Sequence, residues 1–212
     1  DAPRASGDGP GGEGRERDGD DDGGRVHALL AGVRQRHQQE DGDLRDGRED
    51  EINTCIACNQ ACLDHTFTGK LTSCLVNARA CRETEVEIAP AALAKDIAVV
   101  GAGPAGLAFA TIAAERGHKV TLFEASDEIG GQFNLAKRIP GKEEFHETLR
   151  YFARMIDVRG VTLRLGTRVD AAKLVADGFD DVIVATGITP RTPQIPGIDH
   201  AKVVRYIDVI TG

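Results

Sequence analysis

The stretch DIAVVGAGPAGLAFATIAAERGHKVTLFE, residues 96–124, decides the fold. After Asp96, its residues IAVV are apolar and partly β-branched and are followed by a glycine, which predicts a strand. Small and apolar residues from Pro104 to Arg116 predict a helix, with proline in the first turn and Gly117 just beyond the end. Lys119 to Phe123 predicts a second strand. A strand, a helix and a strand in this order predict a parallel βαβ unit.

The turn between the first strand and the helix contains the pattern G-x-G-x-x-G at Gly101, Gly103 and Gly106. The pattern is weak alone, but here it follows a predicted strand and opens a predicted helix, as dinucleotide binding requires. The three glycines then allow a tight turn, a close approach of the backbone to a pyrophosphate, and close packing of helix on strand. Glu124 ends the second strand, where a carboxylate can bind ribose hydroxyls and would repel the 2′-phosphate of NADP.

Two later segments identify the dinucleotide. Gly130, Gly131 and Gln132 follow the second strand, and VIVATG, residues 182–187, ends a further apolar strand at Gly187. In combination these segments resemble the flavoproteins that bind two dinucleotides, so we expect FAD. The periodicity also predicts a helix over 142–158 and strands over 161–165 and 181–185. The expected fold class is α/β, with a partial, Rossmann-like FAD-binding parallel sheet in residues 91–212.

Residues 51–90 hold all five cysteines, four of them in the stretch CIACNQACLDHTFTGKLTSC, residues 55–74. Zinc ribbons usually contain two C-x2-C turns. Three close cysteines followed by one distant cysteine are more typical of a [4Fe–4S] cluster. Zinc, and free or disulfide-bonded thiols, remain alternatives. We expect Cys81 to be a buried cysteine outside the ligand set, and His65 to have a surface or supporting role.

Charge and composition limit the other possibilities. The net charge is −8, and residues 1–50 contain eight Arg, no Lys, 14 acidic residues and 11 Gly. That composition predicts a disordered acidic segment, or one produced by a reading-frame error. The absence of a basic patch argues against nucleic-acid binding. The absence of an apolar run of about 20 residues argues against a membrane span. The absence of a signal sequence leads us to expect a cytoplasmic location.

Three segments carry a family resemblance: INTCIACNQACLDHTFTGKLTSCLVN from residue 52, IAVVGAGPAGLAFA from residue 97 and GGQFNLAKRIPGKEEF from residue 130. They resemble bacterial 2,4-dienoyl-CoA reductases and, more widely, trimethylamine dehydrogenase and the NADH:flavin oxidoreductases related to old yellow enzyme. The resemblance implies that the cluster ligands are Cys55, Cys58, Cys62 and Cys74. With the glycine roles above, it implies FAD contacts at Gly101, Gly103, Ala105, Gly106, Glu124, Gly131, Gln132, Lys142, Val169 and Gly187.

The resemblance also implies a larger enzyme. A TIM barrel would hold FMN and an enoyl-CoA-type or other small-molecule substrate, and electrons would pass from NAD(P)H through FAD and the cluster to FMN. Only about 50 residues precede the cysteines, whereas such a barrel takes about 250. The catalytic Tyr and His of that barrel have no counterparts, so we expect a fragment without catalytic residues. The alternatives are a self-standing FAD and iron–sulfur electron-transfer module, or a zinc-binding interaction protein with a vestigial Rossmann unit.

Overall fold

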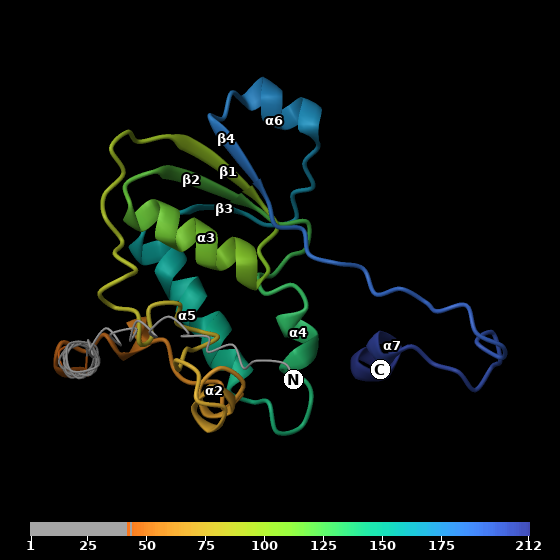
Figure 1. Cartoon of the computed structure of the whole chain (residues 1–212). Coiled ribbons are helices and arrows are strands. Elements are labelled where there is room, and N and C mark those ends of the chain that lie inside the picture. The colour runs from red at the N-terminus through yellow and green to blue at the C-terminus, as the bar shows by residue number, and fades with distance from the viewer. Residues whose placement is uncertain (1–41, 43) are drawn as a thin grey trace, which may run out of the picture.

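The fold is a twisted parallel sheet covered by helices on both faces (Figure 1). The structure is a computed structural model that describes residue 42 and residues 44–212. Its strands are β1 (Asp96–Val100), β2 (Lys119–Phe123), β3 (Thr162–Arg164) and β4 (Asp181–Val184), in the spatial order β3-β2-β1-β4. The expected α/β Rossmann-like sheet is confirmed. Its strand order reverses between β1 and β4, which is where ligands bind in such sheets.

The main core lies between the sheet and two helices, α3 (Pro104–Glu115) and α5 (Phe145–Val158) (Figure 1). Because side chains alternate along a strand, Ile97 and Val99 of β1 face these helices and Ala98 faces the other side. There α6 (Ala171–Asp177) packs Leu174 against Ala98 and Phe123. The buried residues of this core are Ile97, Val99, Ala102, Leu107, Ala110, Ala113, Val120, Leu122, Ile156 and Val161.

Most element bounds agree with the sequence prediction to within one residue, one helix begins later than expected, and several short helices were not predicted. The helix expected from Lys142 begins at Phe145, because the preceding residues form turns in which Glu143 Oε1 accepts a hydrogen bond from Gly141 N–H. The helix α6 was not predicted, nor was the short α4 (Phe133–Ala136). The signals for α6 were present: Asp170 caps its first turn and Gly178 ends it in a left-handed conformation.

The cysteine-rich segment has little regular secondary structure (orange to yellow in Figure 1). Its helices are the single turn η1 (Glu49–Glu51), which contacts α5, and α2 (Leu63–Phe67). The predicted disordered or frame-disturbed segment lies outside the described residues for 1–41 and 43. Residues 42 and 44–50 are described, and residues 49 and 50 belong to η1, which contacts α5.

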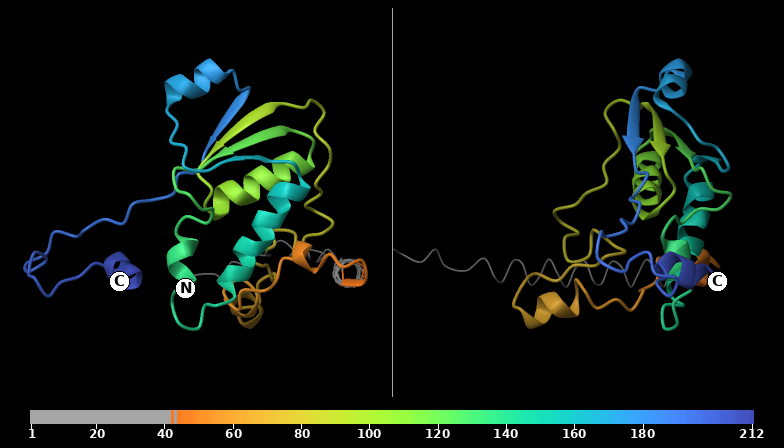
Figure 2. Two further views of the ribbon diagram at one scale, coloured as in Figure 1. Left: turned by 180° about the vertical axis from the view of Figure 1, so that it is seen from behind. Right: turned by 90° about the vertical axis from the view of Figure 1, so that its right-hand side faces the viewer.

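Beyond β4 the chain extends away from the sheet and ends in α7 (Tyr206–Thr211), which lies near α4 (Figure 2). Within the part of the chain that the structure describes, none of the helices has the length and apolarity needed to cross a membrane.

Candidate dinucleotide and metal sites

The turn after β1 is closed so tightly that two of its positions accept only glycine. Gly101 has a φ of +106°, and a Cβ there would lie 2.4 Å from the carbonyl oxygen of Ala185. A Cβ on Gly106 would lie 1.8 Å from the carbonyl oxygen of Gly101. Both separations are far below any van der Waals contact. The first and third glycines of the pattern therefore have the packing roles expected from the sequence.

Gly103 serves a different purpose, because a Cβ on it would meet no atom within 4 Å and its φ of −75° suits any residue. It is the N-cap of α3, and no side chain caps that helix. The N-terminal N–H groups of α3, which include those of Ala105 and Gly106, are therefore open to an anion and favoured by the helix dipole. A Cβ on Gly131 would lie 3.2 Å from Gly103 Cα, so a second glycine faces the same open turn.

Glu124, directly after β2, holds this turn in place. Its Oε2 accepts a hydrogen bond from Ala102 N–H at 2.7 Å, and its Oε1 accepts one from Ser126 N–H at 2.9 Å. Burial raises the pKa of Glu124, but hydrogen bonds from Ser126 and Ala102 outweigh that effect and lower its pKa. Glu124 is therefore a carboxylate at neutral pH, and each oxygen retains a lone pair for a ribose hydroxyl.

The loop around Gly131 is hydrogen-bonded both to the glycine turn and to the segment after β4. Gly130 N–H donates to the carbonyl of Ala102 at 2.7 Å, which places this loop against the glycine turn. The Gln132 side chain donates from Nε2 to the carbonyl of Ile188 at 2.8 Å, which brings in the segment after β4. Gly130, which was named beside Gly131 from the sequence but not counted among the expected FAD contacts, has a φ of +117°.

The remaining expected contacts, Gly187, Val169 and Lys142, lie in three different parts of the fold. Gly187 follows β4 with a φ of +73°, one residue from the Gln132 contact. Val169 packs against the cluster of Ala98, Phe123 and Leu174 on the opposite face of the sheet. The Lys142 ammonium lies 5.1 Å from the centre of the Phe145 ring. The structure thus gathers the glycines, Glu124 and Gln132 near the carboxyl ends of the strands, whereas Lys142 contacts Phe145.

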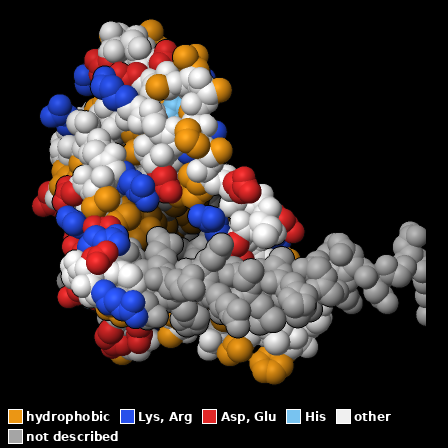
Figure 3. Space-filling view, turned by 90° about the vertical axis from the view of Figure 1, so that its left-hand side faces the viewer, with side chains coloured by type: hydrophobic (Ala, Val, Ile, Leu, Met, Phe, Trp, Pro, Cys, Tyr) orange, Lys and Arg blue, Asp and Glu red, His pale blue; other side chains and the backbone are white. Residues whose placement is uncertain are grey.

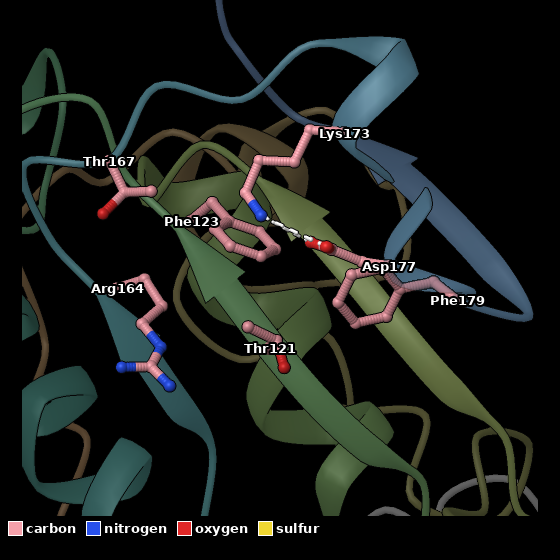
Figure 4. Close-up of a pocket in the computed structure, with 7 residues that line it drawn as sticks. All are labelled: Thr121, Phe123, Arg164, Thr167, Lys173, Asp177 and Phe179. Atoms are coloured by element: carbon pink, nitrogen blue, oxygen red, sulfur yellow. Dashed lines mark hydrogen bonds and ion pairs between the residues drawn. The ribbon is translucent and has the colours of Figure 1, made fainter. Parts of the chain in front are cut away.

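Pockets occur elsewhere on the surface. One, of about 430 Å³, lies on the α6 face of the sheet (Figure 4). Its walls include an ion pair of Lys173 with Asp177 and the guanidinium of Arg164, over the rings of Phe123 and Phe179. None of the expected FAD contacts lines it. On the side seen in Figure 3, basic and acidic side chains of the described residues are interspersed among hydrophobic ones.

All five cysteines are free thiols. Cys55 and Cys74 line one pocket of about 320 Å³, together with Asn53 and Thr54. Cys58 and Cys62 are not part of that lining. Among residue 42 and residues 44–212, no three His, Cys, Asp or Glu side chains converge as a metal site. The first and last of the expected ligands therefore line one pocket, and the four cysteines do not converge as a metal site in the described part of the chain.

The local chemistry of this loop nevertheless fits thiolate ligands. Ala57 N–H donates to Cys55 Sγ at 3.3 Å, and amide hydrogen bonds to sulfur are typical of iron–sulfur sites. Ala57 and Asn59 have φ values of +52° and +54°, which are costly for residues other than glycine and often occur at functional sites. The hydroxyl of Thr54 is buried with no partner among the described residues. Such a group is costly unless a ligand or water satisfies it.

The other two polar residues singled out by sequence have structural contacts. His65 Nδ1 lies 3.0 Å from the carbonyl oxygen of Leu71, so its ring supports the loop that leads to Cys74. The expectation that Cys81 is buried is wrong, because the residue is only partly buried. Its φ of +61° and a hydrogen bond from its N–H to Glu83 Oε1 place it in a turn near the surface.

Comparison with known proteins extends this description. The metal reductase of Desulforamulus reducens is 44% identical over 170 residues, which cover 78% of this chain and 25% of that protein. The solved structure of a 2-naphthoyl-CoA reductase complex is 39% identical with a TM-score of 0.78 and covers 82% of this chain and 26% of that chain. The solved structure of histamine dehydrogenase from Rhizobium sp. 4-9 is 31% identical with a TM-score of 0.63. It covers 71% of this chain and 23% of that chain.

Two consequences follow from these coverages. The chain spans about a quarter of the length of these relatives. An alignment of 170 residues is longer than residues 95–212, so the likeness to the metal reductase also takes in the cysteine-rich segment.

The relatives are flavoenzymes of the trimethylamine dehydrogenase type and other oxidoreductases, and the specific likeness to dienoyl-CoA reductases is not confirmed. Residues 95–211 match the family described as pyridine nucleotide-disulphide oxidoreductase, which is more than half of the chain. They are also the residues that form the parallel sheet and the glycine turn. The chain belongs to the pyridine nucleotide-disulphide oxidoreductase family and carries the FAD-binding fold of that family.

Proposed function

We propose that this chain is the electron-relay part of a flavoprotein oxidoreductase, with FAD on the glycine turn and a [4Fe–4S] cluster on the cysteine-rich segment. The observation that carries the proposal is that both sites lie on one packed unit, in which η1, just before the cysteines, contacts α5. When bound, FAD would accept a hydride from NAD(P)H, and the cluster would take electrons one at a time. The rest of the proposal concerns what the chain does for these groups.

The glycine turn would hold the FAD pyrophosphate through backbone N–H groups. Gly103 leaves open space where a side chain would obstruct the phosphates, and α3 presents an uncapped N-terminus there. The carboxylate of Glu124 would accept hydrogen bonds from the ribose. Gly131 and Gln132 would contact the FAD from the loop that follows β2. Val169 and Lys142 remain proposed contacts that no described interaction supports.

The cysteine loop would supply four thiolates from Cys55, Cys58, Cys62 and Cys74. A hydrogen bond joins the two ends of the loop, because the Asn53 side chain donates from Nδ2 to the carbonyl of Val76 at 2.7 Å. The N–H of Ala57 would stabilise the thiolate of Cys55.

The electron acceptor would be an FMN-bearing barrel outside this chain. Four large apolar side chains around the cysteine loop are exposed, and Phe67 is 84% exposed. Several exposed large apolar side chains on one short segment favour an interaction site there. The four exposed apolar residues are Leu63, Phe67, Leu71 and Leu75. The naphthoyl-CoA reductase among the relatives supports an enoyl-CoA-type substrate for the whole enzyme, and we assign no catalytic residue to this chain.

The test is a cofactor count on the full chain, purified and reconstituted without oxygen. We expect about one FAD and about four iron and four sulfide per chain, as one [4Fe–4S] cluster requires. Cys55→Ser should lose iron and keep FAD, whereas the matched control Cys81→Ser should keep both. Zinc in place of iron, with no flavin, would contradict the proposal and favour a zinc-binding interaction protein.

A further inference from the structure

The helix α5 contacts both proposed sites through neighbouring residues. Leu149 packs at the flavin side: a Cβ on Gly130 would lie 2.9 Å from Leu149 Cδ2, so this side chain abuts the loop that faces the glycine turn. The next residue, Arg150, reaches to the backbone that leads into the cysteine loop. One rigid element therefore touches both loops.

Arg150 binds that backbone with both ends of its guanidinium. Its Nη1 donates to the carbonyl of Asp50 at 2.6 Å, and its Nη2 donates to the carbonyl of Ile52 at 3.0 Å. Its Nε donates to Glu147 Oε2 at 2.6 Å, one turn earlier in α5, which fixes the direction of the side chain. A planar fork with five donors is suited to such a contact, whereas a lysine has a single ammonium.

Arg154, one helical turn beyond Arg150, adds a second pair of contacts on the same face. Its Nη2 donates to Glu51 Oε1 at 3.0 Å, and its Nε forms an ion pair with Asp50 Oδ2 at 3.0 Å. The two arginines thus hold three consecutive residues, 50–52, and the Glu51 side chain is largely buried.

The held segment leads directly into the loop of the expected ligands. Ile52 precedes Cys55 by three residues, and the intervening Asn53 bonds to the carbonyl of Val76 beyond Cys74. A constraint at Ile52 therefore reaches both ends of the loop. On its other face α5 is fixed in the core by Ile156, with Phe152 packed against that core.

We propose that α5 is the spacer between the flavin and the cysteine loop, and that Arg150 is the positioning residue that sets their separation. This inference rests on the proposed function. Arg150 fixes the gap across which one electron leaves reduced FAD, which is oxidised, and enters the cluster, which is reduced. The rate of electron transfer falls steeply as the distance between donor and acceptor grows. In enzyme reactions, likewise, a misplacement of the reacting groups by about 1 Å can lower the rate about 100-fold.

The experiment uses the full chain, reconstituted without oxygen, in three variants. Arg150→Met keeps the length of the side chain and removes its donors, and Arg150→Lys keeps the charge without the fork. Arg159→Met is the matched control, because Arg159 caps the same helix and pairs with Glu115 of α3 rather than with residues 50–52. The measurements are FAD, iron and sulfide content, hydrogen exchange at residues 50–62, and the rate of electron transfer from FAD to the cluster after flash reduction.

We expect Arg150→Met to keep its cofactors, to exchange hydrogen faster at residues 50–62, and to transfer electrons at least about tenfold more slowly. The exchange and electron-transfer rates of Arg150→Lys should lie between those of Arg150→Met and the native chain, and those of Arg159→Met should match the native chain.

An unchanged electron-transfer rate in an Arg150→Met chain with full cofactors would overturn the inference. Loss of iron in both Arg150 variants would also overturn it, because Arg150 would then serve cluster loading. If Arg150→Met does not fold, the rate in Arg150→Lys decides: slower supports the inference, and unchanged overturns it. A native chain without iron would refute the proposed function instead.

Discussion

The glycine turn and the cysteine loop are stabilised in different ways. In the turn, Gly101, Gly106 and Gly130 are enclosed by neighbouring atoms, and Glu124 bonds two backbone N–H groups. The cysteine loop buries Ile56 and Ala61 among its described residues but exposes Phe67. Packing and the hydrogen bonds of Glu124 therefore determine the turn. The loop depends on contacts with α5 and, we propose, on a bound cluster.

The largest effect should come from Gly106→Ala. The new Cβ would lie 1.8 Å from the carbonyl oxygen of Gly101, so strand and helix must separate. We expect a loss of at least about 4 kcal/mol in the free energy of unfolding, or no folded protein, measured by urea denaturation. Gly103→Ala is the control, because its Cβ meets no atom: stability should be kept while FAD affinity falls. Equal stability of the two variants would contradict the packing role of Gly106.

The next largest effect should come from removing the metal, which should change hydrogen exchange in the cysteine loop and not in the sheet. If the cysteine loop relies on its ligand, an iron chelator should raise hydrogen exchange at residues 55–74 towards that of an open loop. Amides of β1 and β2 should keep their protection, because Val99 and Leu122 in those strands are fully buried in the core. Exchange mass spectrometry measures both regions in one experiment. Simultaneous loss of protection in the sheet would show that the two regions fold as one unit.

The same contrast explains what the sequence could predict. Apolar runs and glycines fix strands and tight turns locally, so β1, α3, β2 and the role of Gly101 followed from their own residues. The contacts of Arg150 could not be foreseen, because they join residues 98 and 100 positions apart. The cysteine spacing predicts a ligand type, but the loop has too few buried side chains for its path to follow from a pattern. The helix α6 escaped prediction although its caps were visible, because it has only seven residues.

A smaller effect within the turn should come from Glu124→Gln. An amide can accept only one of the two backbone hydrogen bonds, so we expect a loss of about 1 kcal/mol above pH 5, reduced by the partial exposure of the group. Because folding lowers the pKa of Glu124, its contribution is present above the ordinary glutamate pKa and is lost as pH falls through the lowered value. Urea denaturation from pH 7 to pH 3 should therefore show the two proteins converging in acid. A constant difference at all pH values would contradict the carboxylate assignment.

The smallest effect should come from Asp170→Ala, at the start of α6. Asp170 Oδ1 accepts a hydrogen bond from Lys173 N–H at 2.8 Å, and loss of such a cap costs about 1 kcal/mol. Asp170→Asn should keep most of the stability, because asparagine caps equally well. Leu174 holds α6 on the sheet independently of the cap, so exchange should rise in α6 before it rises in β1. If β1 instead lost protection together with α6, the second face of the sheet would contribute to its stability as strongly as the α3 face, and the turn would depend on packing from both sides.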